Sequence, residues 1–202
     1  YFNGYESFKA GVLKVDNGIQ DDYAELLRVF KFSDPQAASF CSAEMEVAIQ
    51  KASKLITLKS ITARPEIKDP EKEAELGNDL MVRKEYNEWV DDSYLLIGLA
   101  RFYKQQYTEG ATVFAYCINE ANDPLTKKEA AIWLARLNNE IKNYSEAYRL
   151  LMEMEIGDSD PRRLHEMYYS TLADLYIKQK RYEEAVEPLP KATSLTKGKT
   201  NT

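Results

Sequence analysis

One pattern of small, aromatic and apolar positions occurs three times in the second half of the chain. Each copy has a small residue, a tyrosine nine positions later, a second small residue three positions after that, and an apolar residue four positions further on. In chain order the copies are Gly98, Tyr107, Gly110 and Phe114, then Ala135, Tyr144, Ala147 and Leu151, then Ala173, Tyr182, Ala185 and Leu189. Constant internal spacing of this kind predicts a helical hairpin that is repeated along the chain.

Each residue type suits one place in such a hairpin. Small residues are needed where helices meet, because helix axes can lie about 8–10 Å apart only if the side chains at the contact permit it. The tyrosine is expected at the turn between the two helices, where its ring can be buried and its hydroxyl can reach water. The pattern resembles the tetratricopeptide repeat, which has about 34 residues per unit. We therefore predict an all-α fold, a right-handed superhelical stack of antiparallel helix pairs.

The links between the repeats are also visible. The tyrosines are 37 and 38 residues apart (144−107 and 182−144), so the additional residues must lie between the pairs. The turn-rich segments 122–124 and 157–161, which both end in proline, are the expected links. They divide the region into repeats at 83–122, 123–159 and 160–196, followed by a frayed tail at 197–202. Pro188 and Pro190 fall within the last helix and predict a kink or break there.

The first 60 residues predict irregular helical hairpins. Apolar residues three and four positions apart give three helical faces. They are Tyr5, Phe8, Val12 and Val15; Tyr23, Leu26, Leu27 and Phe30; and Met45, Ile49, Ala52, Leu55 and Ile56. The first helix is expected to stop at residues 16–18 with asparagine or glycine in a left-handed cap, and the third helix to end near Lys59.

Residues 61–82 predict a charged insertion between the N-terminal hairpins and the repeats. From 64 to 85, 12 of 22 residues are charged, and Pro65, Pro70 and Gly77 interrupt the segment. Such a composition favours a solvated and partly disordered loop. Helix is expected to resume near Arg83 and to continue to about Lys104, so that the whole chain forms one continuous solenoid.

Charge and composition disfavour several classes of function. The net charge is −6 and no basic run is present, which does not favour nucleic acid, and no stretch approaches 18 apolar residues. His165 is the single histidine, and we interpret it as a surface or capping residue because no ligand-type residues accompany it. We predict no enzyme, no metal and no cofactor. Cys41 and Cys117 are expected as buried thiols, although a disulfide in an oxidising compartment stays open.

In a stack of this type, the first helix of each pair lines the concave face. Counting from the first small residue of each copy gives the candidate partner-binding positions. They are Asp92, Leu95, Leu99, Phe102, Tyr103, Glu129, Ile132, Arg136, Asn139, Glu140, Met167, Ser170, Asp174, Ile177 and Lys178. The predicted groove is apolar at one end and of mixed charge at the other, which suits a protein segment or helix better than a small anion.

Two further points bear on this groove. Leu99, Arg136 and Asp174 occupy places where carboxylate-clamp repeats carry lysine, asparagine and arginine, so a clamped chaperone tail is not expected. In an alternative interpretation, the apolar residues Leu95, Leu99 and Phe102 are simply covered by the preceding helices.

Four segments resemble one known family. They read YFNGxxxFKxG (1–11), DDYxxLLxVF (21–30), MExAIxKASK (45–54) and YNxWVDDSYLLIG (86–98). In this order, and over residues 1–154, they are similar to the N-terminal repeat region of the tetratricopeptide lipoproteins of the type IX secretion and gliding motility system of the Bacteroidetes, of the PorW/SprE type.

The resemblance implies a non-enzymatic protein–protein interaction scaffold in the periplasm, attached to the outer membrane by a lipidated cysteine upstream of this chain. Its partners would be other proteins of the cell envelope, from the secretion machinery or the translocon, and its role would be to support protein export and gliding motility. The family proteins are longer, so we expect this chain to be part of a longer array. Two alternatives stay open: a tetratricopeptide lipoprotein of outer-membrane β-barrel assembly, and a small-ligand receptor or enzyme.

Overall fold

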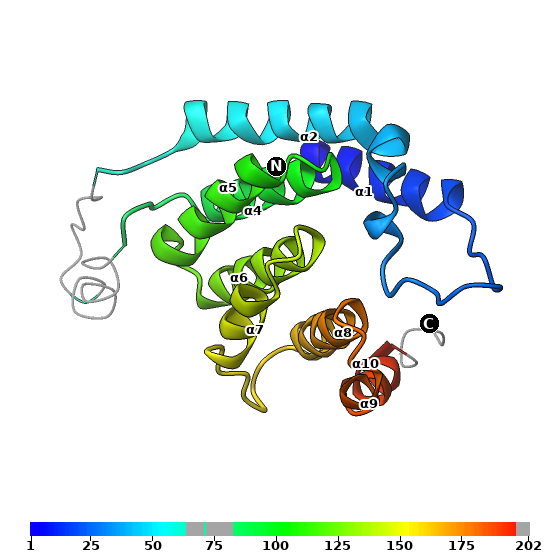
Figure 1. The fold of residues 1–202 in the computed structure, drawn as a ribbon. Helices are drawn as coiled ribbons and strands as arrows, with labels where there is room; N and C mark the ends of the chain where they lie inside the picture. Colours follow the sequence, from blue (N-terminus) through cyan, green and yellow to red (C-terminus); the bar gives the residue numbers. More distant parts are fainter. Residues whose placement is uncertain (64–70, 72–82, 197–202) are drawn as a thin grey trace.

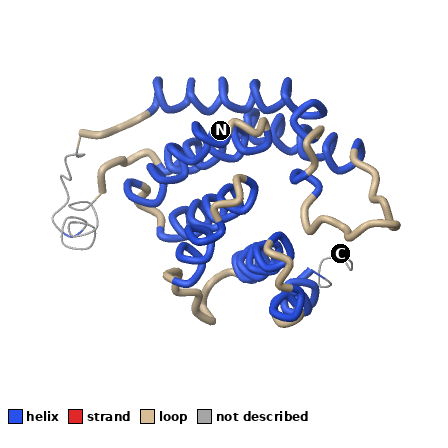
Figure 2. The backbone as a smooth tube through the Cα atoms, viewed as in Figure 1, coloured by secondary structure: helices blue, strands red, loops and turns tan. Residues whose placement is uncertain are grey.

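The computed structural model describes residues 1–63, 71 and 83–196, and within these ranges the chain contains helices and no strand (Figures 1 and 2). The helices are α1 (Phe2–Gly18), the 3-10 helix η1 (Lys31–Ser33), α2 (Ala37–Lys59), α4 (Glu88–Tyr103), α5 (Tyr107–Glu120), α6 (Pro124–Glu140), α7 (Tyr144–Met152), α8 (Arg162–Lys178), α9 (Tyr182–Ala185) and α10 (Pro188–Thr196). The all-α prediction is therefore confirmed over the described ranges. The predicted insertion at 61–82 lies largely outside them, and the tail at 197–202 lies wholly outside them.

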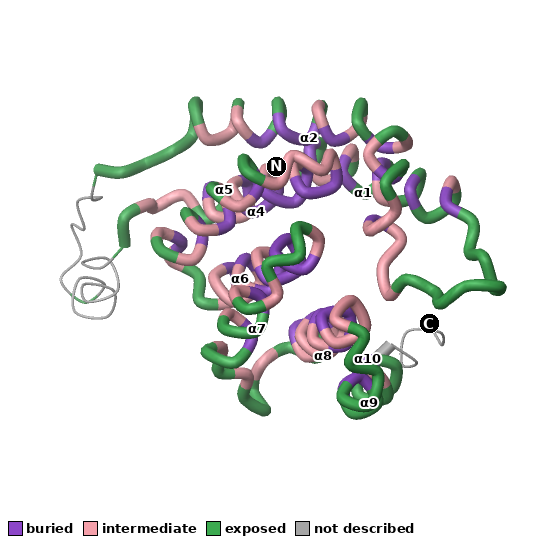
Figure 3. The backbone as a smooth tube through the Cα atoms, in the orientation of Figure 1, coloured by how far each residue is buried: buried purple, intermediate pink, exposed green. Residues whose placement is uncertain are grey.

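Successive helices pack side by side along one stack. α1 contacts α2, α2 contacts α4, each helix from α4 to α6 contacts the next one, and α8 contacts α6, α7 and α10. Figure 1 shows these helices as an arc from α1 and α2 to α9 and α10, with the connection between α1 and α2 on the inner side. The buried residues follow the stack (Figure 3): one large cluster extends from α1 to α8, and a smaller one joins α6, α7 and α8.

The helix pairs α4–α5, α6–α7 and α8–α9 turn back in the same way. Gln105, Lys142 and Lys180 each lie two residues before the repeated tyrosine and have φ values of 57°, 63° and 62°. At each turn the following amide donates to the carbonyl five residues earlier, as from Asn143 to Asn138 at 2.8 Å. This is the Schellman arrangement, in which a left-handed residue lets the chain satisfy the last carbonyls of a helix. The three repeats therefore share a backbone conformation as well as a residue pattern.

Replacing Lys142 by glycine is expected to raise the free energy of unfolding by about 0.5–1 kcal/mol, because glycine adopts positive φ without the penalty that other residues carry. Lys142 is exposed, and its side chain forms no ion pair with the described residues. Urea denaturation followed by far-UV circular dichroism measures the change. Gln105→Gly is the control: the Gln105 side chain donates to the carbonyl of Asp34 at 2.9 Å, so its loss should cancel the gain. A drop in stability for Lys142→Gly would contradict the expected strain.

Small residues keep the helices close, as the pattern predicts. A Cβ atom built on Gly98 would lie 2.6 Å from Cε1 of Phe114, whose ring is fully buried on α5. A Cβ atom on Gly110 would meet only an ordinary contact, at 3.4 Å from Leu137 of α6. The alanines that replace these glycines in the later repeats, and that are also buried, are Ala135, Ala147, Ala173 and Ala185. The first small position is therefore the more restrictive of the two in the first repeat.

Two predictions for the N-terminal half are wrong. Residues 19–30 form an irregular loop instead of a short helix, and Tyr23 and Leu26 are 83% and 65% exposed. Helical spacing of apolar residues stabilises a helix only where another element covers that face, and no described element covers Tyr23 and Leu26. α1 does end at Gly18, but no glycine in the described ranges has positive φ. Gly18 is instead required by close packing, because a Cβ atom there would lie 2.6 Å from the ring of Phe40.

The other helix boundaries follow local signals. α2 ends at Lys59, as predicted. α4 begins at Glu88, later than expected, because the side chain of Asn87 accepts a hydrogen bond from the amide of Trp89 at 3.0 Å and caps the helix there. The predicted break in the last helix is confirmed: α9 ends at Ala185, and α10 begins at Pro188, where the missing N–H of proline is not needed.

Candidate functional site

The inner side of the arc is partly filled by residues 30–34, which we call the inner segment. Phe32 packs edge-on against Phe102 of α4, with ring centroids 4.9 Å apart, and contacts Trp133 of α6 at 5.9 Å. Phe30 stacks on Phe32 at 4.6 Å. The inner segment therefore lies on the face of α4 and α6 that the repeat pattern predicts to be open.

Polar contacts hold the inner segment in this position. Ser33 Oγ donates to Glu140 Oε1 at 2.6 Å and accepts from Lys178 Nζ at 3.3 Å. The backbone carbonyl of Asp34 accepts from Gln105 Nε2 at 2.9 Å. These hydrogen bonds connect the inner segment to α6, to α8 and to the turn between α4 and α5.

The structure buries most of the predicted partner-binding side chains. Those less than one tenth exposed are Leu95, Leu99, Phe102, Tyr103, Ile132, Arg136, Asn139, Met167 and Asp174. Those of intermediate exposure are Asp92, Glu129, Glu140, Ser170, Ile177 and Lys178. Leu95 and Leu99 share a small pocket with Tyr1 and Tyr5 of the N-terminal region. The apolar groove expected at the first repeat is thus closed, because α1 and the inner segment return over α4.

Four of the predicted groove residues bind one another between α6 and α8. Asn139 Nδ2 donates to Asp174 Oδ2 at 3.0 Å, and Lys178 Nζ donates to Asp174 Oδ2 at 2.9 Å and to Glu140 Oε1 at 2.6 Å. Burial raises the pKa of Asp174, and the ammonium of Lys178 opposes this effect. The charges and hydrogen bonds of these side chains are therefore engaged with each other.

What remains open is a pocket of about 850 Å³ between the inner segment and α6, α8 and α10. It brings together four residues of the predicted groove, Tyr103, Arg136, Met167 and Ser170, with residues that come from outside it. The charged residues around it are Asp16, Lys31, Arg136, Arg163 and Glu166. Apolar surface is supplied by residues such as Phe30, Trp133 and Leu189.

Arg136 is the central charged residue of this pocket and is 6% exposed. Its Nε donates to Thr171 Oγ1 at 2.8 Å, and its Nη2 donates to Ser170 Oγ at 3.2 Å. The guanidinium carbon lies 4.4 Å from the ring centroid of Phe30 and 4.5 Å from that of Trp133. None of the ion pairs between described residues includes Arg136. Burial lowers the pKa of Arg136 to about 10, so the side chain stays cationic at neutral pH.

The sequence pattern selects Arg136 but misses the residues that surround it. Trp133 precedes Arg136 by three positions and so lies on the same helical face, a signal that could have been used. Thr171 likewise lies on the same face of α8 as the predicted residue Met167, four positions earlier, whose carbonyl its hydroxyl reaches at 2.6 Å. Phe30 belongs to a loop more than a hundred residues away in the sequence (136−30), and no local signal places it there.

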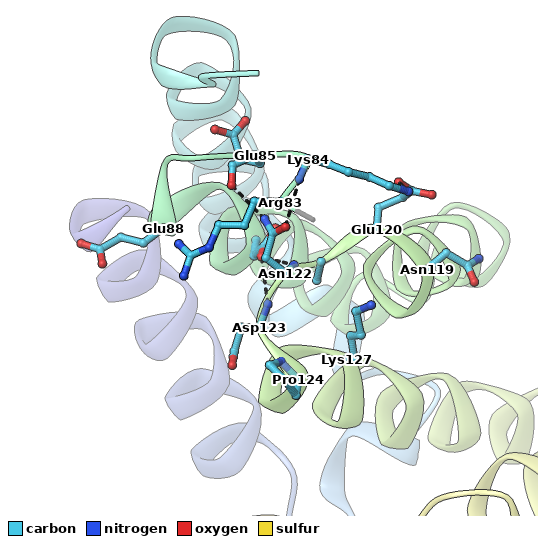
Figure 4. A pocket seen from close by; sticks show the side chains of 12 residues that line it. Arg83, Lys84, Glu85, Glu88, Asn119, Glu120, Asn122, Asp123, Pro124 and Lys127 are labelled. Atoms are coloured by element: carbon cyan, nitrogen blue, oxygen red, sulfur yellow. Dashed lines mark hydrogen bonds and ion pairs between the residues drawn. The ribbon is translucent and has the colours of Figure 1, made fainter. Parts of the chain in front are cut away.

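A second pocket, of about 580 Å³, lies where residues 83–87 meet the turn between α5 and α6 (Figure 4). The backbone N–H of Asn122 donates to Asp91 Oδ2 at 2.7 Å, and the side-chain Nδ2 of Asn122 donates to the backbone carbonyl of Glu85 at 2.9 Å. Lys84 forms an ion pair with Glu120. These contacts hold residues 83–87 against the turn, and we assign this site a structural role.

The capacity for metal binding, for membrane crossing and for side-chain reactivity also bears on the chemistry of the part of the chain that the structure describes. No group of three or more histidine, cysteine, aspartate or glutamate residues there is placed to hold a metal ion. None of the helices described combines the length and apolar character that crossing a membrane requires. Cys41 and Cys117 are free and buried, as predicted, and burial raises their pKa values to about 11 and about 12. His165 Nε2 lies 3.2 Å from the carbonyl oxygen of Gly157.

Comparison with known proteins assigns no family. No protein-family model matches the chain, and no curated protein matches it significantly. The class of the molecule therefore rests on its own pattern and geometry: an all-α protein of stacked helices, with an inner pocket around a buried arginine.

Proposed function

We propose that the chain is a solenoid of the tetratricopeptide type and works as a non-enzymatic scaffold that binds other proteins. The observation that carries this proposal is the left-handed turn that recurs at Gln105, Lys142 and Lys180. Each turn stands at the same offset from the small residues and the tyrosine of its repeat, so the residue pattern and the backbone repeat coincide. Repeats of this kind bury a continuous core by stacking, and stacked repeats present extended binding surfaces.

The proposed setting of this scaffold is the periplasm, with attachment to the outer membrane through a lipid anchor upstream of this chain. Its proposed role is to support type IX protein secretion and gliding motility, with envelope proteins of the secretion machinery or translocon as partners. The support for this role is the ordered resemblance of segments 1–11, 21–30, 45–54 and 86–98 to the lipoproteins of that system.

Two measurements in the native host test the proposal. Affinity capture of the full-length tagged protein from envelope extracts, followed by mass spectrometry, should recover components of the type IX machinery. Deletion of the gene should leave exported cargo inside the cell while outer-membrane β-barrels assemble normally. Normal export in the deletion strain would rule out the secretion role, and a general loss of β-barrels would point to barrel assembly instead.

A further inference from the structure

The guanidinium of Arg136 has hydrogen-bonding capacity that the chain leaves unused. Nε and Nη2 donate to Thr171, to Ser170 and to the carbonyl of Met167, which are all neutral acceptors. Nη1 has no hydrogen-bond partner among the residues described. In the same ranges, Nε1 of Trp133 is also a buried donor without a partner. A buried donor without an acceptor lowers stability. The carboxylates of Asp174 and Glu166 favour the charged form of Arg136, but none of the ion pairs between described residues includes this arginine.

The arrangement does prepare Arg136 for an incoming ligand. The rings of Phe30 and Trp133 cover the guanidinium, and a stacked guanidinium can donate hydrogen bonds only in its own plane. Within that plane α8 already holds Nε and Nη2 through Thr171 and Ser170. Arg136 lines the 850 Å³ pocket, and because its guanidinium is already held in a fixed orientation, little conformational entropy is lost when a ligand binds to Nη1.

The cations around the pocket differ in how far they are already engaged. Three cations, Lys31, Arg136 and Arg163, and two acids, Asp16 and Glu166, line it. Lys31 Nζ is held by the backbone carbonyls of Asp16 and Ile19, and Arg163 is paired with Glu129 at 3.3 Å.

A carboxylate fits this setting better than a phosphate. It carries one negative charge, and one of its oxygens can accept a charge-assisted hydrogen bond from Nη1 of Arg136. A doubly charged phosphate would be left undercompensated by a single arginine, because the other two cations have partners. The apolar surface beside Arg136, at Phe30 and Leu189, also suits the carbon skeleton that accompanies a carboxylate in a protein.

We propose that this pocket binds a carboxylate of a partner protein, which accepts from Nη1 of Arg136 and forms a direct ion pair with it. The apolar part of the partner segment lies against Phe30 and Leu189. This inference rests on the proposed scaffold function and specifies the chemistry of the segment that the scaffold recognises.

Phenylacetate is a suitable probe, because it joins one carboxylate to one apolar ring. Trp133 lies against Arg136, so its fluorescence should respond when the pocket is occupied. Trp89 is the other tryptophan and is 47% exposed, and Trp89→Phe removes its signal. In this background, phenylacetate should give a saturable change with a Kd of about 1 mM. Phenylacetamide, which has the same shape without the charge, and inorganic phosphate should give none at equal concentrations.

A matched pair of arginine variants tests the assignment of the residue. Arg136→Gln should weaken phenylacetate binding at least about tenfold, whereas Arg149→Gln should leave it within about twofold. Arg149 is a suitable control because it is an exposed arginine on α7 that pairs with Glu146 and Glu153, and its replacement changes the net charge equally. The inference is overturned by equal binding of phenylacetamide, by a preference for phosphate, or by unchanged binding to Arg136→Gln.

Arg136→Lys keeps the inference testable if Arg136→Gln does not fold. Lysine retains the charge but lacks the planar edge, so phenylacetate binding should weaken several-fold, and binding as tight as in the parent would overturn the assignment.

The two proposals can also fail separately. If the full-length protein with Arg136→Gln captures its envelope partners as before, the scaffold stands and the carboxylate pocket falls. If phenylacetate binds as expected but the deletion strain exports normally, the secretion role falls and the pocket stands.

Discussion

Replacement of Phe32 by alanine is expected to lower the free energy of unfolding by about 3–5 kcal/mol, the usual cost of truncating a buried phenylalanine. Phe32 is 7% exposed, and its ring lies within 6 Å, centroid to centroid, of Phe102, Tyr103 and Trp133. Its removal would leave a cavity on the inner side of α4 and α6 that the connection between α1 and α2 cannot easily refill. Urea denaturation followed by far-UV circular dichroism gives the free energy.

Leu26→Ala is the matched control for this prediction. Leu26 belongs to the same connection between α1 and α2 but is 65% exposed, so its truncation should change stability by no more than about 0.5 kcal/mol. A loss below about 1 kcal/mol for Phe32→Ala would mean that the inner segment releases from α4 and α6 at little cost. In that case the predicted groove of the first repeat would be available to a partner, and the burial of Phe102 would be only one of its states.

Gly98→Ala is expected to lower the free energy of unfolding by about 1–2 kcal/mol, although alanine favours the helix by up to about 1 kcal/mol. The added methyl group would lie 2.6 Å from Cε1 and 2.8 Å from Cδ1 of Phe114. The ring of Phe114 is fully buried between α4 and α5, so relief requires the two helices to move apart. Thermal and urea denaturation of the purified variant measure the loss.

Gly110→Ala provides the opposite expectation in the same helix pair. Its methyl group would make ordinary contacts, the nearest at 3.4 Å from Leu137, so stability should rise by about 0.5–1 kcal/mol through helix propensity alone. Phe114→Leu should reduce the cost of Gly98→Ala, because the smaller side chain removes the clash, and the double-mutant cycle measures this coupling. Equal effects of the two glycine substitutions would contradict the packing described for the first repeat.

The candidate site was only partly predictable. The repeat pattern selects Arg136, Asn139 and Asp174 as positions on one face of their helices, because helical periodicity depends on neighbours three and four residues away. It does not reveal that Asn139 and Asp174 are bonded to each other, since the partners of a polar side chain depend on the facing helix. For this reason a list of inward-facing positions overestimates the surface available to a ligand.

The sequence by itself determined the features that arise from short-range interactions. These include the helical class of the chain, the end of α2 at Lys59, the break before Pro188 and the small residues at the helix contacts. Spacing, proline geometry and side-chain size act within a few residues, so they can be recognised without knowledge of the rest of the chain.

Only the tertiary structure decided the path of residues 19–34 and the nature of the pocket. The apolar residues of the loop have helical spacing, but Tyr23 and Leu26 remain exposed while Phe30 and Phe32 pack against helices distant in the sequence. Whether an apolar or charged side chain is buried, and what lies beside it, depends on which surfaces meet when the helices stack. The burial of Arg136 against two aromatic rings, without a carboxylate of the described chain to pair with it, is the result of that long-range packing.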